Sequence, residues 1–180
     1  MAGYQEDTKG CFTLKMSKQN IIKHIRSLLF DLVIMTVMIA VFYILFNEWN
    51  LFILIIVGYY IVNLAPAVYL FYEHYNQSKG VLLEINMDEI KFLNLGTSIK
   101  FEDVSGVTLF CPLSDIRESS IRFSSVENYS FLRIESNNIK YNISCLMMND
   151  LNNLFELFNS KNKEKIGTLF PSMRFYGNYK

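Results

Sequence analysis

The sequence predicts a helical hairpin embedded in a membrane, followed by an α+β domain of seven antiparallel strands and a C-terminal helix. The apolar runs Leu28–Phe46 and Leu51–Tyr72 hold 19 and 22 residues, and Asp31 is their only charged residue. At 1.5 Å per residue each run spans a hydrocarbon core of about 30 Å. Backbone groups in lipid must satisfy one another, so both runs are expected to be helices, antiparallel because their connector is short. From Val81 onward the apolar residues no longer recur at helical spacing but alternate with polar residues, which predicts the sheet.

The chain divides into four segments: a leader (1–17), the hairpin (18–75, with spans at about 28–46 and 51–72), a domain (80–160) and a basic, aromatic tail (161–180). Within the leader, Cys11–Lys15 alternates weakly and is a possible short strand. The first helix is expected to begin near Lys18, before the bilayer. Glu73–Gly80 is expected to be a short polar linker, and the tail shows no clear element.

Alternating apolar residues and tight-turn signals predict the strands of the domain. The expected strands are Val81–Asn86, Glu89–Leu95, Ser98–Phe101, Val104–Cys111, Ser120–Ser125, Ser130–Glu135 and Ile139–Ser144. Turn signals lie at 87–88, 96–97 and 137–138. Asn149 is a candidate N-cap for a helix whose apolar stripe is Leu151, Leu154, Phe155 and Phe158. Lys161, Lys163 and Lys165 are expected at the C-terminal end of this helix, where the helix dipole is negative.

Charge and cysteine content exclude some classes of protein. Residues 81–160 carry six basic and eleven acidic side chains, whereas both flanks are basic. An acidic domain argues against nucleic acid as the partner. The three cysteines, Cys11, Cys111 and Cys145, form no CxxC pair and fit reduced thiols in the cytosol.

The distribution of basic residues predicts the orientation of the hairpin. Five Lys and Arg residues precede the first span, more follow the second, and the connector Asn47–Asn50 has none. The positive-inside rule therefore places both termini in the cytoplasm. Lys23, Arg26 and Trp49 are expected to be interfacial anchors. The basic pair could also recognise anionic lipid, but topology anchoring is the simpler interpretation.

Two polar residues interrupt the apolar spans. Asp31 lies about one turn from the cytoplasmic end, and its position favours a carboxylate that reaches the headgroups or pairs with Arg26 over ion or proton handling. Asn63 lies deeper, three residues before Pro66. Its amide is expected to cap the backbone freed by the proline or to bind the first helix.

Motifs for catalysis are absent from the sequence, which has no glycine-rich phosphate loop, no GxSxG and no HExxH. The only histidines, His24 and His74, flank the hairpin and could meet with Glu73 around a metal. Solvated interfacial histidines are the favoured alternative. Cys111 and Cys145 have no basic residue beside them in sequence and are expected to be small core residues. The sequence thus predicts no enzyme, no cofactor and no metal.

The order of elements resembles a membrane-anchored pleckstrin-homology-like protein of the bacterial YcxB type. The stretches that carry the resemblance are Gly80–Leu95, Ile99–Val104 and Ile139–Phe158, behind the lead-in Phe12–Ser17 and the hairpin. The resemblance implies a half-open barrel closed by the helix, an inner-membrane location and no catalytic residues. Phosphoinositide binding is disfavoured because the first hairpin tip, Asn86–Glu89, is acidic.

Two functions compete. The first is a non-enzymatic protein-interaction or scaffold module whose partner contacts sheet edges or the loop 112–119, with Arg117 and Arg122 as candidate contacts. The second is a membrane component: an oligomeric hairpin, a transporter accessory or a toxin-immunity protein. Gly58 and Asn63 would then support close helix approach. In both functions the lipid bilayer is an expected partner of the hairpin.

Overall fold

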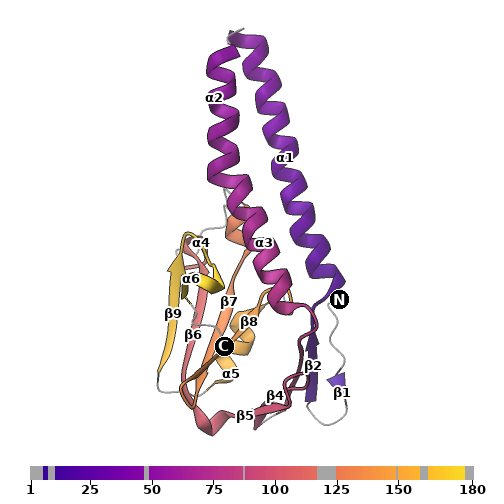
Figure 1. The fold of residues 1–180 in the computed structure, drawn as a ribbon, viewed down its shortest axis with the longest axis vertical. Helices are drawn as coiled ribbons and strands as arrows, with labels where there is room; N and C mark the ends of the chain where they lie inside the picture. The colour runs from indigo at the N-terminus through magenta and orange to yellow at the C-terminus, as the bar shows by residue number, and fades with distance from the viewer. Residues whose placement is uncertain are drawn as a thin grey trace.

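The computed structural model describes residues 6–7, 11–46, 49–86, 88–116, 125–148, 150–158 and 162–176. Figure 1 shows two long helices standing side by side on a body of strands and short helices. The lower parts of both helices run beside this body, so the hairpin and the domain are in contact.

The first helix of the hairpin is α1 (Lys18–Phe46), which begins at the residue expected. The second is α2 (Trp49–Tyr59), the π-helical turn η1 (Tyr60–Leu64) and α3 (Ala65–Ser78) in one continuous rod. Two stretches, Lys18–Leu45 and Ile53–Ser78, are long and apolar enough to cross a membrane.

The π-helical turn has a local cause. Pro66 lies in the first turn of α3 and has no backbone N–H, and its ring would collide with the carbonyl four residues earlier. The chain accommodates the ring by widening, so that the Ala65 N–H donates to the carbonyl oxygen of Tyr60, five residues back. The prediction of a polar linker over Glu73–Gly80 is wrong for residues 73–78. These residues belong to α3, which continues to Ser78 and has a buried face toward the domain.

The first sheet has the order β1-β2-β3-β4-β5 with antiparallel neighbours. Its strands are β1 (Glu6–Asp7, two residues), β2 (Cys11–Lys15), β3 (Leu82–Ile85), β4 (Glu89–Phe92) and β5 (Thr97–Lys100). The strand expected in the leader is therefore present. It pairs with β3, which follows the hairpin in the sequence, so that Leu14 lies opposite Leu83.

The second sheet has the order β8-β7-β6-β9. Its strands are β6 (Val104–Pro112), β7 (Phe131–Ser136), β8 (Ile139–Ser144) and β9 (Lys163–Thr168). Asn137 and Asn138 join β7 to β8 with φ of 52° and 62°, which confirms the tight turn and explains the two asparagines. The strand β9 pairs in parallel with β6, so Lys163 and Lys165 lie in a strand and not at a helix end.

The prediction of a single seven-stranded barrel is wrong, because the strands form two separate sheets. The expected strand Ser120–Ser125 lies outside the described residues except for Ser125, which begins the short helix η3 (Ser125–Asn128). The alternation of apolar and polar residues predicts where strands lie but not which strands pair. The pairing decides whether the strands form one barrel or two sheets.

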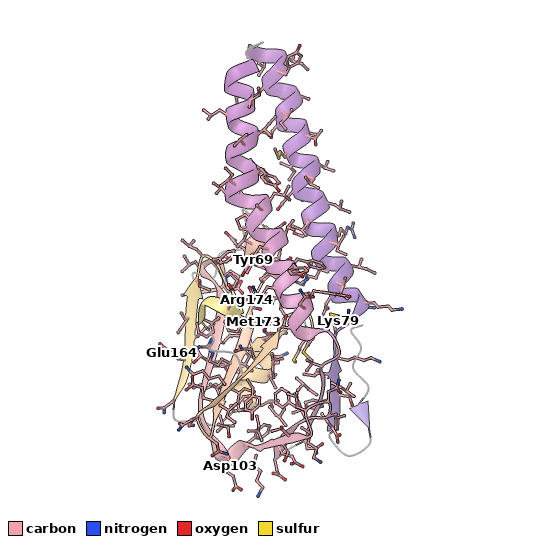
Figure 2. The ribbon with its side chains drawn as sticks, in the orientation of Figure 1. Tyr69, Lys79, Asp103, Glu164, Met173 and Arg174 are labelled. Carbon is pink, nitrogen blue, oxygen red and sulfur yellow. The ribbon has the colours of Figure 1, made fainter. Side chains whose placement is uncertain are left out.

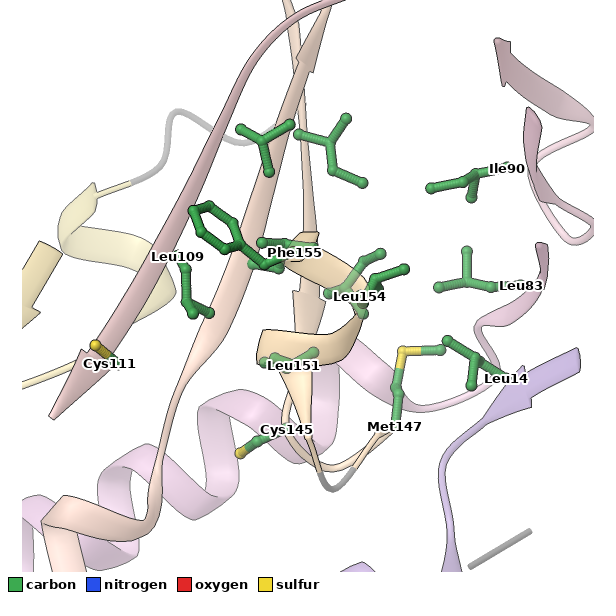
Figure 3. Close-up of a cluster of buried hydrophobic side chains, with 14 of the residues drawn as sticks. Leu14, Leu83, Ile90, Leu109, Cys111, Cys145, Met147, Leu151, Leu154 and Phe155 are labelled. Carbon is green, nitrogen blue, oxygen red and sulfur yellow. The ribbon is translucent and has the colours of Figure 1, made fainter. Parts of the chain in front are cut away.

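The C-terminal helix of the prediction is α5 (Leu151–Leu157), which is capped by the carboxylate of Asp150 accepting from the Asn152 N–H at 3.0 Å. Figure 3 shows α5 between the sheets, with Phe155 beside Leu109 and Leu154 directed toward Leu83. The buried side chains of both sheets and α5 form one cluster. The remaining short helices are η2 (Phe101–Asp103), α4 (Leu113–Ile116) and α6 (Met173–Tyr176).

Candidate functional site at the base of the hairpin

The helices of the hairpin enter the core of the domain. Ala67 and Leu70 of α3 are fully buried and belong to the same apolar cluster as Leu14 and Leu83 of the first sheet. Around this apolar contact lies a group of buried polar side chains, which we call the junction cluster: His24, His74, Tyr129, Ser144 and Cys145.

Cys145 lies at the centre of the junction cluster, just after β8. Its Sγ atom is 3.6 Å from Nε2 of His24 on α1 and 3.9 Å from Nδ1 of His74 on α3. The ring of Tyr129 contacts both imidazoles, with centroids 4.9 and 5.3 Å away. The thiol therefore meets both helices of the hairpin at one point.

Main-chain carbonyl groups surround the ring of His24. Nδ1 is 2.8 Å from the carbonyl oxygen of Asn20, and Nε2 is 3.2 Å from that of Asn128. A carbonyl oxygen only accepts, so the ring satisfies both contacts when both nitrogens carry a proton. In that state its charge faces the sulfur of Cys145, which makes a thiolate–imidazolium pair the arrangement that the geometry favours.

His74 is held differently. Its Nε2 donates to the carbonyl oxygen of Pro171 at 3.0 Å, and its Nδ1 lies 2.9 Å from Oγ of Ser144. That hydroxyl oxygen already accepts from the Leu146 N–H at 3.1 Å, so its own proton is free to point at Nδ1. Through these two contacts His74 ties α3 to both β8 and the C-terminal segment.

The surroundings of Cys145 change its acidity. Burial by itself raises the pKa of the thiol, but hydrogen bonds from His24 and His74 and the charge of the two rings outweigh this and hold the pKa well below its usual value. Burial raises the pKa of Tyr129 well above its ordinary value, so the phenol stays neutral. Its hydroxyl has no hydrogen-bond partner among the residues that the structure describes.

We expect Cys145 to be a thiolate at neutral pH. The difference in absorbance at 240 nm between the native protein and Cys145→Ser should show a thiolate whose titration midpoint lies below the usual thiol pKa of about 8.5, and the signal should vanish as pH falls through that midpoint. Unfolding in denaturant should return the midpoint to about 8.5. Cys111→Ser is the matched control, because burial raises the pKa of that thiol. A midpoint at or above 8.5 in the folded protein would contradict the ion pair.

A second set of contacts joins α1 to η3. A carboxylate oxygen of Asp31 accepts from the Ser125 N–H at 3.0 Å, and Oγ of Ser27 lies 3.1 Å from Oγ of Ser125. The Asn128 amide donates to Ser27 at 2.8 Å. Asp31 is therefore held by the domain, an arrangement that neither expected role for this residue included.

The C-terminal segment closes the junction on the side of α3. Glu73 is buried and accepts from the Ser172 hydroxyl at 2.8 Å and from the Arg174 N–H at 2.6 Å. Figure 2 shows Met173 and Arg174 beside α3, below Tyr69. The ring of Tyr69 stacks on Phe170 with centroids 5.9 Å apart. Glu73 thus binds the C-terminal segment, and among the described residues it forms no metal-holding group with the two histidines.

The other residues singled out in the sequence are distributed around this junction. Lys23 and Arg26 are exposed on α1, and Asn63 is partly buried within η1, where no hydrogen bond joins its amide to another described residue. Trp49 begins α2. Arg117 and Arg122 lie outside the described residues.

The junction cluster is not evident from the sequence. His24 and His74 were expected to be solvated, but their exposed fractions are 4% and 0%. Cys145 was expected to have no basic neighbour, because both neighbours come from helices 121 and 71 positions away. One signal was available: Ala67, Leu70 and His74 follow each other at helical spacing, which puts the histidine on the buried face of α3.

The described residues contain no group of three or more His, Cys, Asp or Glu side chains arranged to hold a metal ion. No protein-family model, no curated protein and no solved structure matches the chain.

Proposed function

We propose that this chain is an integral membrane protein of the cytoplasmic membrane that holds its α+β domain in a fixed orientation on the cytoplasmic face, as a non-enzymatic protein-interaction or scaffold module. The observation that carries the proposal is the junction itself. Both helices of the hairpin are fastened to the domain by buried side chains, and the stretches beyond it are apolar and exposed. Such a base fixes the angle of the domain to the bilayer, which a flexible linker would not do.

An enzyme would use the junction cluster differently. A catalytic thiolate must reach a substrate, and its histidine must exchange protons with that substrate. Cys145 is 6% exposed, and His24 is occupied by two carbonyl oxygens. These contacts support a structural ion pair that fixes the helices to the domain.

We propose that the surface for a partner lies on the outer face of the second sheet, and we keep Arg117 and Arg122 as the contacts predicted from the sequence. A polar hollow of about 570 Å³ opens there between β6, β7 and β9, and its lining includes Thr108, Glu135 and Lys163. Each terminal strand of the described sheets other than β1 carries lysine: Lys100 in β5, Lys140 in β8 and Lys163 in β9. Charged edges oppose strand addition, so a contact through loops and the hollow is favoured.

The second candidate is a membrane component, and it has an observation of its own. A side chain placed at Gly58 would meet nothing within 4 Å, so this face of α2 is open to another helix. Asn63 lies close by in a π-helical turn, a local structure that is often found at functional sites.

One set of variants separates the two candidates. The measurement is quantitative capture of cross-linked partners from intact cells. Exchanging the apolar residues of 34–46 and 51–57 for a leucine–alanine sequence leaves the junction intact, so this variant should capture partners as well as the native protein does. Asn63→Leu should be tolerated equally. Thr108→Arg, or Arg117→Glu with Arg122→Glu, should lower capture severalfold at unchanged membrane level, because they alter complementarity at the contact. Loss of capture in Asn63→Leu at normal abundance, with indifference to the domain variants, would favour the membrane component.

A further inference from the structure

An open groove of about 480 Å³ runs along the lower part of α1 where η3 approaches it. Its rim carries Lys23 and Arg26, and its floor is formed by Leu29, Phe30 and Val33. The three floor residues keep between 56% and 63% of their surface exposed, so the domain does not fill the groove.

The side chains of the groove are ordered along α1. Lys23, Arg26, Phe30 and Val33 are three or four residues apart and therefore lie on one face of the helix. At 1.5 Å per residue, the apolar end lies about 15 Å beyond Lys23 toward the hairpin tip. The groove is thus cationic at the end near the domain and apolar toward the membrane.

The wall opposite the helix is already formed. Asn128 lines the groove, and its amide donates to Ser27 while its carbonyl oxygen contacts His24. Asp31, the nearest acid on α1, does not line the groove, and its carboxylate accepts from Ser125. The two cations therefore face an open rim without a carboxylate among the lining residues.

We infer that the groove binds one anionic glycerophospholipid from the cytoplasmic leaflet. The phosphate lies between Lys23 and Arg26, and an acyl chain lies along Phe30 and Val33. An anionic phospholipid has a charged headgroup at one end and hydrocarbon chains at the other, so it complements the cationic end and the apolar end of the groove. A free anion would use only the cationic end, and an apolar ligand only the apolar end. The inference rests on the proposed membrane placement and orientation, and it adds a specific lipid ligand to them.

Native mass spectrometry of the full-length protein in a non-ionic detergent tests this inference. With dioleoylphosphatidylglycerol the protein should retain one lipid at a concentration at least about tenfold below that needed with dioleoylphosphatidylcholine. Lys23→Gln with Arg26→Gln should remove this preference. Lys15→Gln with Lys79→Gln is the matched control, because it removes two exposed cations elsewhere. If both double variants lost the preference for phosphatidylglycerol equally, the preference would depend on the overall charge of the protein, and the proposed site would be overturned.

The acyl chain has its own test. Phe30→Gln should weaken retention of phosphatidylglycerol severalfold, whereas Ile44→Gln, at an exposed apolar position near the hairpin tip, should not. Inorganic phosphate at millimolar concentration should not displace the lipid. Displacement by phosphate, together with indifference to Phe30→Gln, would mean that the rim binds a free anion and would overturn the lipid site.

Failure of the membrane placement gives a different result. In that case sodium carbonate would extract the native protein from membranes. Carbonate-resistant protein that shows no preference between the two lipids would overturn the lipid site alone. Unchanged thermal unfolding of the four variants in detergent is the check that they remain folded, which their exposed positions lead us to expect.

Discussion

Replacing Leu154 by Asp is expected to unfold the domain. Leu154 is 1% exposed and projects from α5 into the cluster shared by the two sheets (Figure 3). The substitution removes apolar contacts and buries a charge without a partner, which costs about 4 kcal/mol or more. Domains are stable by only about 5–15 kcal/mol in total. The measurement is thermal unfolding in detergent followed by circular dichroism.

The matched control for this variant is Asn153→Asp on the exposed side of the same helix. It changes the charge equally and should shift the midpoint of unfolding little. A native spectrum and midpoint for Leu154→Asp would mean that α5 does not pack between the sheets.

Replacing Leu70 by Asp is expected to release the hairpin from the domain. Leu70 is fully buried, and it joins α3 to the core beside Leu14 and Leu83. A buried, unpaired carboxylate at this position costs roughly 3–5 kcal/mol. The released helix end should expose the chain after Lys79, so limited trypsin digestion in detergent should cut there much faster than in the native protein.

Asn76→Asp provides the comparison, since it places the same side chain on the exposed face of α3. It should be cut at the native rate. Slow cleavage in Leu70→Asp, with an unchanged midpoint of unfolding, would contradict a shared core of hairpin and domain.

Local patterns predicted the elements whose cause is local. The two apolar runs, the asparagine turn before Ile139 and the stripe on α5 all depend on residues within one or two turns of each other. The strand β9 escaped prediction because it is an edge strand whose Lys163, Glu164 and Lys165 show no alternation of apolar residues. Its partner is the distant β6, and long-range parallel pairing leaves no mark in a local period.

The junction cluster was hidden for a related reason. His24, His74 and Cys145 come from three elements, and only the pairing of β7 with β8 and the docking of both helices bring them together. Asp31 illustrates the same limit. Its depth in the membrane could be read from the sequence, but its partner, the N–H of Ser125, belongs to a segment 94 residues later that was expected to be a strand.

The π-helical turn η1 sets the phase between the two halves of one rod. Such a turn holds one residue more than an α-helical turn, so every side chain after it is rotated by about 100° relative to an uninterrupted helix. The π-helical turn therefore fixes how the face of α3 that carries Ala67 and Leu70 is rotated relative to the face of α2 toward α1. A deletion of one residue within 60–64 would rotate α3 by about 100° relative to α2. The helix formed by α2, η1 and α3 could then keep its native contact with α1 or its native contact with the domain, but not both.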